Sequence, residues 1–256
     1  MKWQAVLVAI TTGLLAGGCG GAKNADEWIK TQFTPPTTEG SAMRLKSERP
    51  DERREALHVV AADRSARAIP TMVQVFCLEA RSDTDPMVRS AAVQGLRFME
   101  GPEVVPSLVL VAAKDGSPYV RADAVAALGL KVDGAAALMQ VLQADRAADV
   151  RVAAAEALRN FKDKAAAQAL VAAMADPSLA VALKAWESLR YMTGHDLPRE
   201  AKPWEEFLAD AADPFASYGK PPPMPKGQNQ RGTFTKGPVD FIRGLFAKDP
   251  NEAELE

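Results

Sequence analysis

Apolar positions in the middle of the chain recur in a fixed phrase that also carries an arginine. The phrase is Val88-Arg89, Val120-Arg121 and Val150-Arg151, and a leucine follows each arginine after seven residues, at Leu96, Leu128 and Leu158. Val181 and Leu189 continue the series, so valines 88, 120, 150 and 181 are 32, 30 and 31 residues apart. Apolar residues at helical spacing within a repeat of this length predict a stack of helix pairs.

Turn signals divide the repeats into five predicted helix pairs. A capping side chain followed by proline favours a helix start, and this signal occurs at Asp85-Pro86, Ser117-Pro118 and Asp176-Pro177. Gly101-Pro102 predicts the break inside the second pair. The first pair is predicted at 51–62 and 66–79, and the second helices of the next three pairs at 104–111, 135–142 and 165–174. The prediction is an all-α, right-handed α-solenoid with capping segments at both ends.

The N-terminus has the pattern of a bacterial targeting segment. Lys2 precedes an apolar stretch that ends at Leu15, which is too short to favour a membrane-spanning helix of about 20 apolar residues. Ala16, Gly17 and Gly18 directly before Cys19 resemble the lipobox of bacterial lipoproteins, although leucine is usual where Ala16 stands. The resemblance implies cleavage before Cys19 and lipid attachment to its thiol, while an ordinary secreted protein is the alternative. No acidic residue directly follows Cys19, which favours an outer-membrane anchor facing the periplasm.

These patterns predict the domain organisation of the whole chain. We expect a signal peptide at 1–18, a lipidated tether at 19–26, an N-terminal cap at 27–50 and helical repeats at 51–192. A C-terminal cap follows at 193–213, with Trp204, Phe207 and Leu208 as its apolar residues. The Pro/Gly-rich tail at 214–256 is expected to contain a short amphipathic helix at 238–248.

Composition and motifs argue against nucleic-acid binding, a disulfide and a catalytic or metal site. The 31 basic and 33 acidic residues nearly balance, so binding of nucleic acid through phosphate neutralisation is not expected. Cys77 is the second of two cysteines and cannot pair with a lipidated Cys19, so no disulfide is expected. Neither His58 nor His195 lies in a metal-ligand spacing, and the sequence contains no Gly-x-Ser-x-Gly motif or phosphate-binding glycine-rich loop. The sequence therefore predicts no catalytic, metal or cofactor site, and the protein is not expected to be an enzyme.

The longer phrase Asp-x-x-x-x-Val-Arg-x-x-Ala-x-x-x-Leu resembles HEAT repeats of the phycobilisome-lyase type over about residues 51–189. The ends, including Phe33-Thr34-Pro35-Pro36 and Met192-Thr193-Gly194-His195-Asp196, look like those of bacterial HEAT-repeat lipoproteins, a group for which the resemblance implies no activity. It also implies a structural ladder in which the arginines pair with the aspartates of neighbouring repeats. The arginines are Arg89, Arg121 and Arg151, and the candidate aspartates are Asp83, Asp115, Asp145 and Asp176. Ala182 replaces the arginine in the fifth repeat, so the ladder is expected to stop there.

A stacked helix array is typical of binding or scaffolding proteins, so we expect a lipid-tethered module for a protein or peptide partner. The second helix of each pair is predicted to form a concave binding face that carries Lys114, Gln140, Gln143 and Gln168. In the alternative, the C-terminal tail contacts an envelope partner and the solenoid is a spacer.

Overall fold

The computed structural model describes residues 37–220, which contain twelve α-helices, one 3₁₀ turn and no strand. The all-α solenoid predicted from the repeat is therefore confirmed. The elements are α3 (Thr38–Arg44), α4 (Pro50–Ala62), α5 (Arg64–Arg67), α6 (Pro70–Ser82), α7 (Pro86–Leu96), α8 (Val104–Lys114), α9 (Pro118–Leu128), η1 (Val132–Gly134), α10 (Ala135–Ala144), α11 (Ala148–Leu158), α12 (Lys164–Ala173), α13 (Leu179–Thr193) and α14 (Ala201–Asp210). The expected signal peptide, Cys19, the tether at 19–26, residues 27–36 of the N-terminal cap and the tail helix at 238–248 lie outside the described residues. No helix within 37–220 is both long and apolar enough to cross a bilayer.

The predicted helix starts hold at two positions and shift at a third. Asp85 caps α7 by accepting the backbone N–H groups of Met87 and Val88, and prolines begin α7 and α9. By contrast, α13 begins at Leu179 with Ser178 as N-cap, two residues after the predicted cap at Asp176. The Asp176 carboxylate instead binds an arginine of the preceding repeat. Asp176 therefore has the position in its repeat that Asp83 has in the second repeat, where Asp83 binds Arg53, and not the position of the helix cap Asp85.

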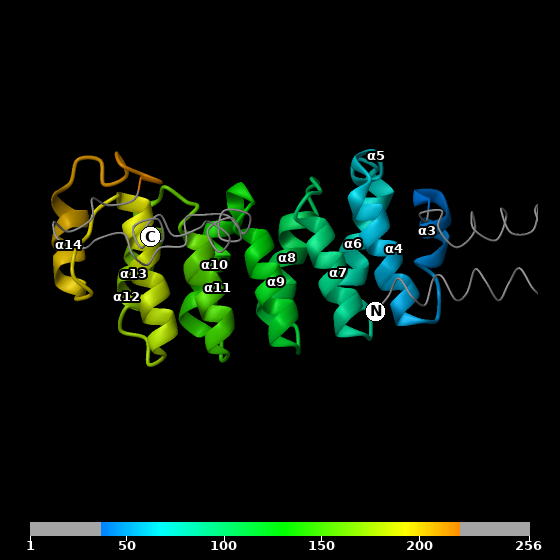
Figure 1. Cartoon of the computed structure of the whole chain (residues 1–256), viewed down its shortest axis with the longest axis horizontal. Helices are drawn as coiled ribbons and strands as arrows, with labels where there is room; N and C mark the ends of the chain where they lie inside the picture. Colours follow the sequence, from blue (N-terminus) through cyan, green and yellow to red (C-terminus); the bar gives the residue numbers. More distant parts are fainter. Residues whose placement is uncertain (1–36, 221–256) are drawn as a thin grey trace, which may run out of the picture. The chain divides into compact units, whose positions relative to one another are not determined.

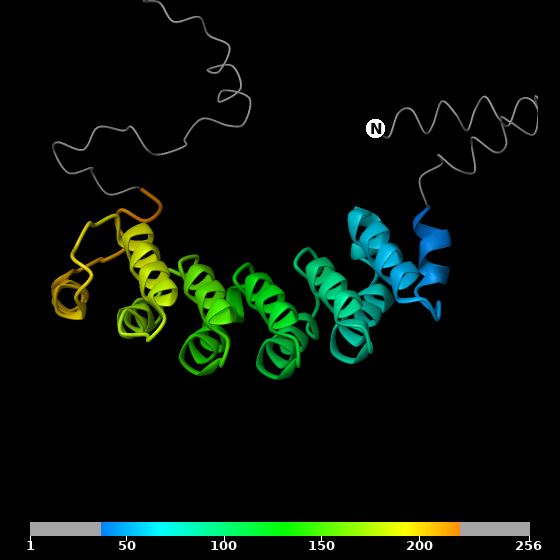
Figure 2. The same cartoon turned by 60° about the horizontal axis from the view of Figure 1, so that its bottom comes forward.

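The helices form two layers (Figure 1). The first-helix layer consists of α4, α7, α9, α11 and α13, each packed directly against the next. The second-helix layer consists of α6, α8, α10 and α12. Within residues 37–220 the row bends, and the first helices lie on its inner side (Figure 2). The prediction that second helices form the concave face was therefore wrong: the helices that carry the Val-Arg phrase form it.

Small residues explain why the first helices approach so closely. The phrase's valines and leucines are buried between the layers, as are alanines such as Ala92, Ala124 and Ala154. At the α9–α11 contact, a Cβ atom added to Gly129 would lie 2.8 Å from the Cβ of Ala157. Because only a small side chain fits at such a contact, the first helices are closely spaced along the inner side of the bend.

Both ends of the stack are covered by additional segments. Helix α3 packs against α4, and hydrogen bonds from the Ser65 and Thr38 hydroxyls lower the pKa of Asp63 to about 2. Helix α14 packs against α12 and buries Trp204, whose indole N–H donates to the carbonyl of Pro198 at 2.7 Å.

The chain then turns back, and Phe215 and Tyr218 pack against the core. The packed region thus extends past residue 213, where the C-terminal cap was predicted to end.

Candidate functional site

Arginine side chains connect each repeat to the next through a ladder of bidentate contacts. The Arg121 Nε lies 2.7 Å from Oδ2 of Asp145, and its Nη2 donates to Oδ1 of the same carboxylate at 2.9 Å. Arg89 makes the same pair of contacts with Asp115, and Arg151 makes it with Asp176. This planar two-point geometry is the one that guanidinium and carboxylate groups favour.

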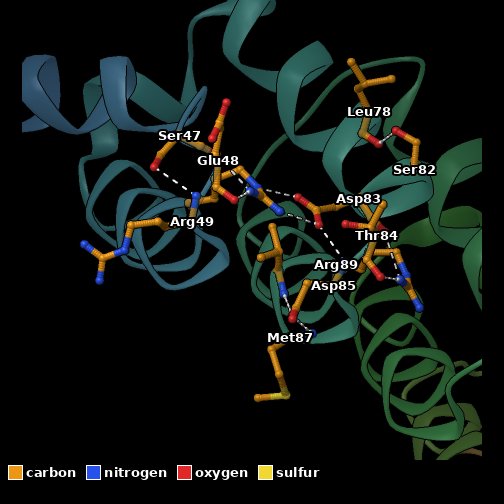
Figure 3. A network of polar contacts seen from close by, with 12 residues as sticks. Ser47, Glu48, Arg49, Leu78, Ser82, Asp83, Thr84, Asp85, Met87 and Arg89 are labelled. Carbon is orange, nitrogen blue, oxygen red and sulfur yellow. Dashed lines mark hydrogen bonds and ion pairs between the residues drawn. The ribbon is translucent and has the colours of Figure 1, made fainter.

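Each ladder arginine also reaches back to the loop before its own helix. Arg89 Nη1 donates to the carbonyls of Asp83 and Thr84, at 2.9 and 3.3 Å, as Figure 3 shows. Arg121 and Arg151 donate in the same way to the carbonyls of Asp115 and Asp145. The guanidinium therefore fixes the preceding loop and the following loop at once.

The aspartates are also shared between two groups. Oδ1 of Asp145 accepts the backbone N–H of Ala147 at 2.8 Å, in addition to its contact with Arg121. Burial alone would raise the pKa of Asp145, but the hydrogen bonds from Arg121 and Ala147 together lower it below its ordinary value. The pKa of Arg121 is raised, chiefly by its hydrogen bond to Asp145. Both groups are thus held in their charged forms.

The structure brings together the residues predicted for the ladder, and it adds one further step. Arg53 binds Asp83 through Nε and Nη2, at 2.7 and 2.9 Å. The phrase around Arg53 is a degraded copy of the later ones: Ala56 keeps the alanine, but Glu52 stands in place of the valine and Val60 in place of the leucine. The ladder ends with Arg151 and Asp176, because Ala182 has no guanidinium to continue it. With side chains between 4 and 15% exposed, these pairs are largely buried, and each one joins two successive repeats.

Surface depressions occur between helices of the second-helix layer and between α12 and the capping helix α14. The α10–α12 groove has a volume of about 610 Å³, and Ala136, Gln140 and Ala172 are among its lining residues. The α8–α10 groove, of about 250 Å³, is lined in part by Ala113 and again by Gln140. The α12–α14 groove, of about 320 Å³, is lined by Ala172 and Gln168 among others. Alanine is the most frequent residue along these grooves, and its short side chain leaves space between the helices unfilled.

The four residues predicted for a binding face do not all line the grooves. Gln140, Gln143 and Gln168 all line the grooves just described, whereas Lys114 lies at the end of α8 and lines none of them. The glutamines therefore share one surface, but that surface is the second-helix layer and not the inner side of the bend.

The remaining candidates for catalysis or metal binding, His58, Cys77 and His195, lie on different elements. His58 is exposed on α4, and the His195 ring packs 4.5 Å from that of Phe207. Burial raises the pKa of the Cys77 thiol, so this buried group remains protonated. Within residues 37–220, no group of three or more His, Cys, Asp or Glu side chains could hold a metal ion.

Comparison with known families agrees with this architecture. A family model described as HEAT repeats matches residues 41–129 and 135–217, which is more than half of the chain. No curated protein matches the chain. HEAT repeats are commonly protein-interaction or scaffold modules. The match spans the predicted Val-Arg phrases and their intervening helices, and on this evidence the chain belongs to the HEAT-repeat family.

Proposed function

We propose that this protein is a non-catalytic binding or scaffolding module, tethered by lipid on Cys19 to the outer membrane and facing the periplasm. We further propose that a protein or peptide partner binds across the second-helix layer. The single observation that carries this second step is the series of adjoining grooves from α8 to α14.

Chemistry along the grooves suits a peptide more than a reactive substrate. Their walls are mostly alanine and other apolar side chains, while the amides of Gln140, Gln143 and Gln168 supply donors and acceptors at the surface. An apolar floor with a few hydrogen-bonding groups favours side-chain insertion together with contacts to a peptide backbone. The ladder supports this role indirectly, because it keeps neighbouring grooves at a fixed separation.

Photo-crosslinking in the native envelope tests the surface. A crosslinker replaces Gln140 on the second-helix layer, and a matched crosslinker replaces Ala126, which is exposed on α9 of the first-helix layer. We expect one adduct from position 140 and none of the same mass from position 126. Ala172→Arg, which fills two grooves at once, should remove that adduct, whereas Ala126→Arg should leave it. Equal adducts from both positions would contradict the assignment of the surface.

A second candidate function assigns the contact to the C-terminal tail and makes the solenoid a spacer. The test is a truncation after Lys220, since Phe215 and Tyr218 pack against the core and must be kept. Loss of the position-140 adduct on truncation, with an unchanged melting curve, would favour the tail.

The lipid anchor requires its own experiment. Cys19→Ala should move the protein from the detergent phase to the aqueous phase and remove the acyl mass from the mature N-terminus. An N-terminus that begins elsewhere, without added acyl mass, would refute the anchor while leaving the groove proposal intact.

A further inference from the structure

Two cations lie against two tyrosine rings at the end of the last repeat. The guanidinium carbon of Arg159 lies 5.1 Å from the centre of the Tyr191 ring, and Nζ of Lys162 lies 4.6 Å from the centre of the Tyr218 ring. The two rings meet edge to face, with centroids 5.4 Å apart. The four side chains therefore form one continuous group, here called the tyrosine–cation cluster.

Three separate parts of the chain build this cluster. Arg159 and Lys162 lie three residues apart after α11, so their Cα atoms are at most about 11 Å apart. Tyr191 belongs to α13, and Tyr218 belongs to the segment that turns back onto it.

Two glycines make that turn possible. Gly194 and Gly219 have φ values of 71° and 73°, a region that favours glycine. A Cβ atom on Gly194 would lie 2.5 Å from the Cβ of Ser217. The backbone N–H of Gly219 donates to the carbonyl of Tyr191 at 3.0 Å, which fixes Tyr218 beside Tyr191.

The hydrogen-bonding capacity of the cluster is largely unused, in contrast to that of the ladder. Arg121 donates from three of its nitrogens, whereas the carboxylate nearest to Arg159 is that of Glu156, with its Oε1 3.6 Å from Nη2. This distance is too long for a strong hydrogen bond, and both side chains are at least 40% exposed. Lys162 is exposed and forms no ion pair with another residue of 37–220. Donors are thus available at the surface.

The Tyr218 hydroxyl adds a donor that stays protonated. Burial raises the pKa of Tyr218, and the neighbouring Tyr191 raises it further, while Arg159 acts in the opposite direction. A guanidinium stacked on a ring keeps its N–H edge free to bind an oxyanion. Positive charge and neutral hydroxyl donors in one place are suited to a group with several acceptor oxygens.

We propose that the tyrosine–cation cluster binds a phosphate group. A phosphate offers oxygens in several directions, so it can accept from the Arg159 guanidinium, the Lys162 ammonium and a tyrosine hydroxyl together. A carboxylate offers its two oxygens in one plane and satisfies fewer of these donors. This site is independent of the second-helix grooves and can be tested without their partner. Its phosphate can come from a free phosphate or from the headgroup of an anionic phospholipid.

The experiment uses the whole chain as a Cys19→Ala form, so that no acyl group binds membranes by itself. Inorganic phosphate is titrated while the tyrosine resonances are followed by NMR, and phosphatidylglycerol vesicles are compared with phosphatidylcholine vesicles by co-sedimentation. We expect Lys162→Gln and Arg159→Gln each to weaken binding at least fivefold. The matched control is Arg97→Gln, because Arg97 also lies over an aromatic ring, that of Phe98, which has no hydroxyl. Tyr191→Phe keeps the ring but removes a donor, and it should weaken binding without changing the melting curve.

Each result has a defined meaning. Saturable phosphate binding that weakens in the cluster variants and not in Arg97→Gln supports a free-phosphate site. Binding to phosphatidylglycerol vesicles alone, with the same variant pattern, supports a headgroup site. Equal losses in Arg97→Gln would show general electrostatic attraction and overturn the proposal. It is also overturned if neither probe binds, or if Lys162→Gln, an exposed change, leaves both unchanged.

Discussion

Arg121→Met should weaken the α9–α11 interface, because Arg121 and Asp145 form the most buried step of the ladder, with side chains 4 and 8% exposed. The substitution removes two hydrogen bonds to the carboxylate and one to the carbonyl of Asp115. Methionine retains much of the apolar stem, so the loss is mainly electrostatic. The charged Asp145 is then left buried with the Ala147 N–H as its remaining donor.

The size of the effect follows from that remaining contact. Removing one member of a buried ion pair costs about 3–5 kcal/mol, because the other charge loses its partner. The retained N–H places our expectation at about 3 kcal/mol, measured as the free energy of unfolding in urea. Arg146→Met is the control, since Arg146 is exposed, lies next to Asp145 and makes no ion pair within the described residues. We expect it to change stability by less than about 0.5 kcal/mol.

A double variant separates the charge effect from packing. Asp145→Asn keeps an acceptor for Ala147 and removes the charge, so adding it to Arg121→Met should recover about 1–2 kcal/mol. Hydrogen exchange should show the lost protection mainly in α9 and α11, because repeats interact chiefly with their neighbours. If Arg121→Met cost no more than Arg146→Met, the ladder would not hold the repeats in register.

Acid should narrow the difference in unfolding free energy between the original protein and Arg121→Met. In the original protein, the lowered pKa of Asp145 contributes stability that is present above about pH 4 and is lost as the pH falls through that pKa. In the variant, Asp145 lacks the guanidinium and protonates more readily. A gap in unfolding free energy that stays constant from pH 7 to pH 3 would refute this. Gly134→Ala should destabilise by at least about 2 kcal/mol, because its Cβ would overlap the carbonyl of Leu128 although its φ of −78° suits alanine. Gly116→Ala meets nothing within 4 Å and should be neutral in the same thermal melts. Leu158→Ala should cost about 2–5 kcal/mol in urea unfolding, since Leu158 is fully buried, and a cost below 1 kcal/mol would contradict the described core.

The sequence predicted the helices well because their signals are local. A proline at N1 begins α7 and α9, and the spacing of valine, arginine and leucine selects one buried helix face. The arginine–aspartate pairs came from a family resemblance rather than from local chemistry, since the partners are 24 to 30 residues apart. Arg53 was missed because its phrase is degraded, although its side chain makes the same contacts.

The sequence did not predict correctly which helix layer lies on the inner side of the bend. Both layers read as apolar, alanine-containing helices, so periodicity alone does not show which layer is more closely spaced. Likewise, Phe215 and Tyr218 lie in a Pro-rich context that predicts little packing, and their contacts depend on Gly194, which lies more than 20 residues earlier. Such long-range contacts have no periodic signal in the sequence.

The ladder and the grooves are two consequences of one asymmetry between the layers. Contacts such as that of Gly129 with Ala157 draw the first helices together, and each ladder pair joins two successive loops at the ends of those helices. When the helices of one layer are held close together on the inner side of a bend, the helices of the other layer must lie further apart. Of the described grooves, the alanine-lined one between α10 and α12 has the largest volume. The ladder arginines line none of these grooves, whereas their partners Asp145 and Asp176 each line one. A surface built in this way can change its alanine and glutamine residues without disturbing the ladder, which is the property expected of a binding module.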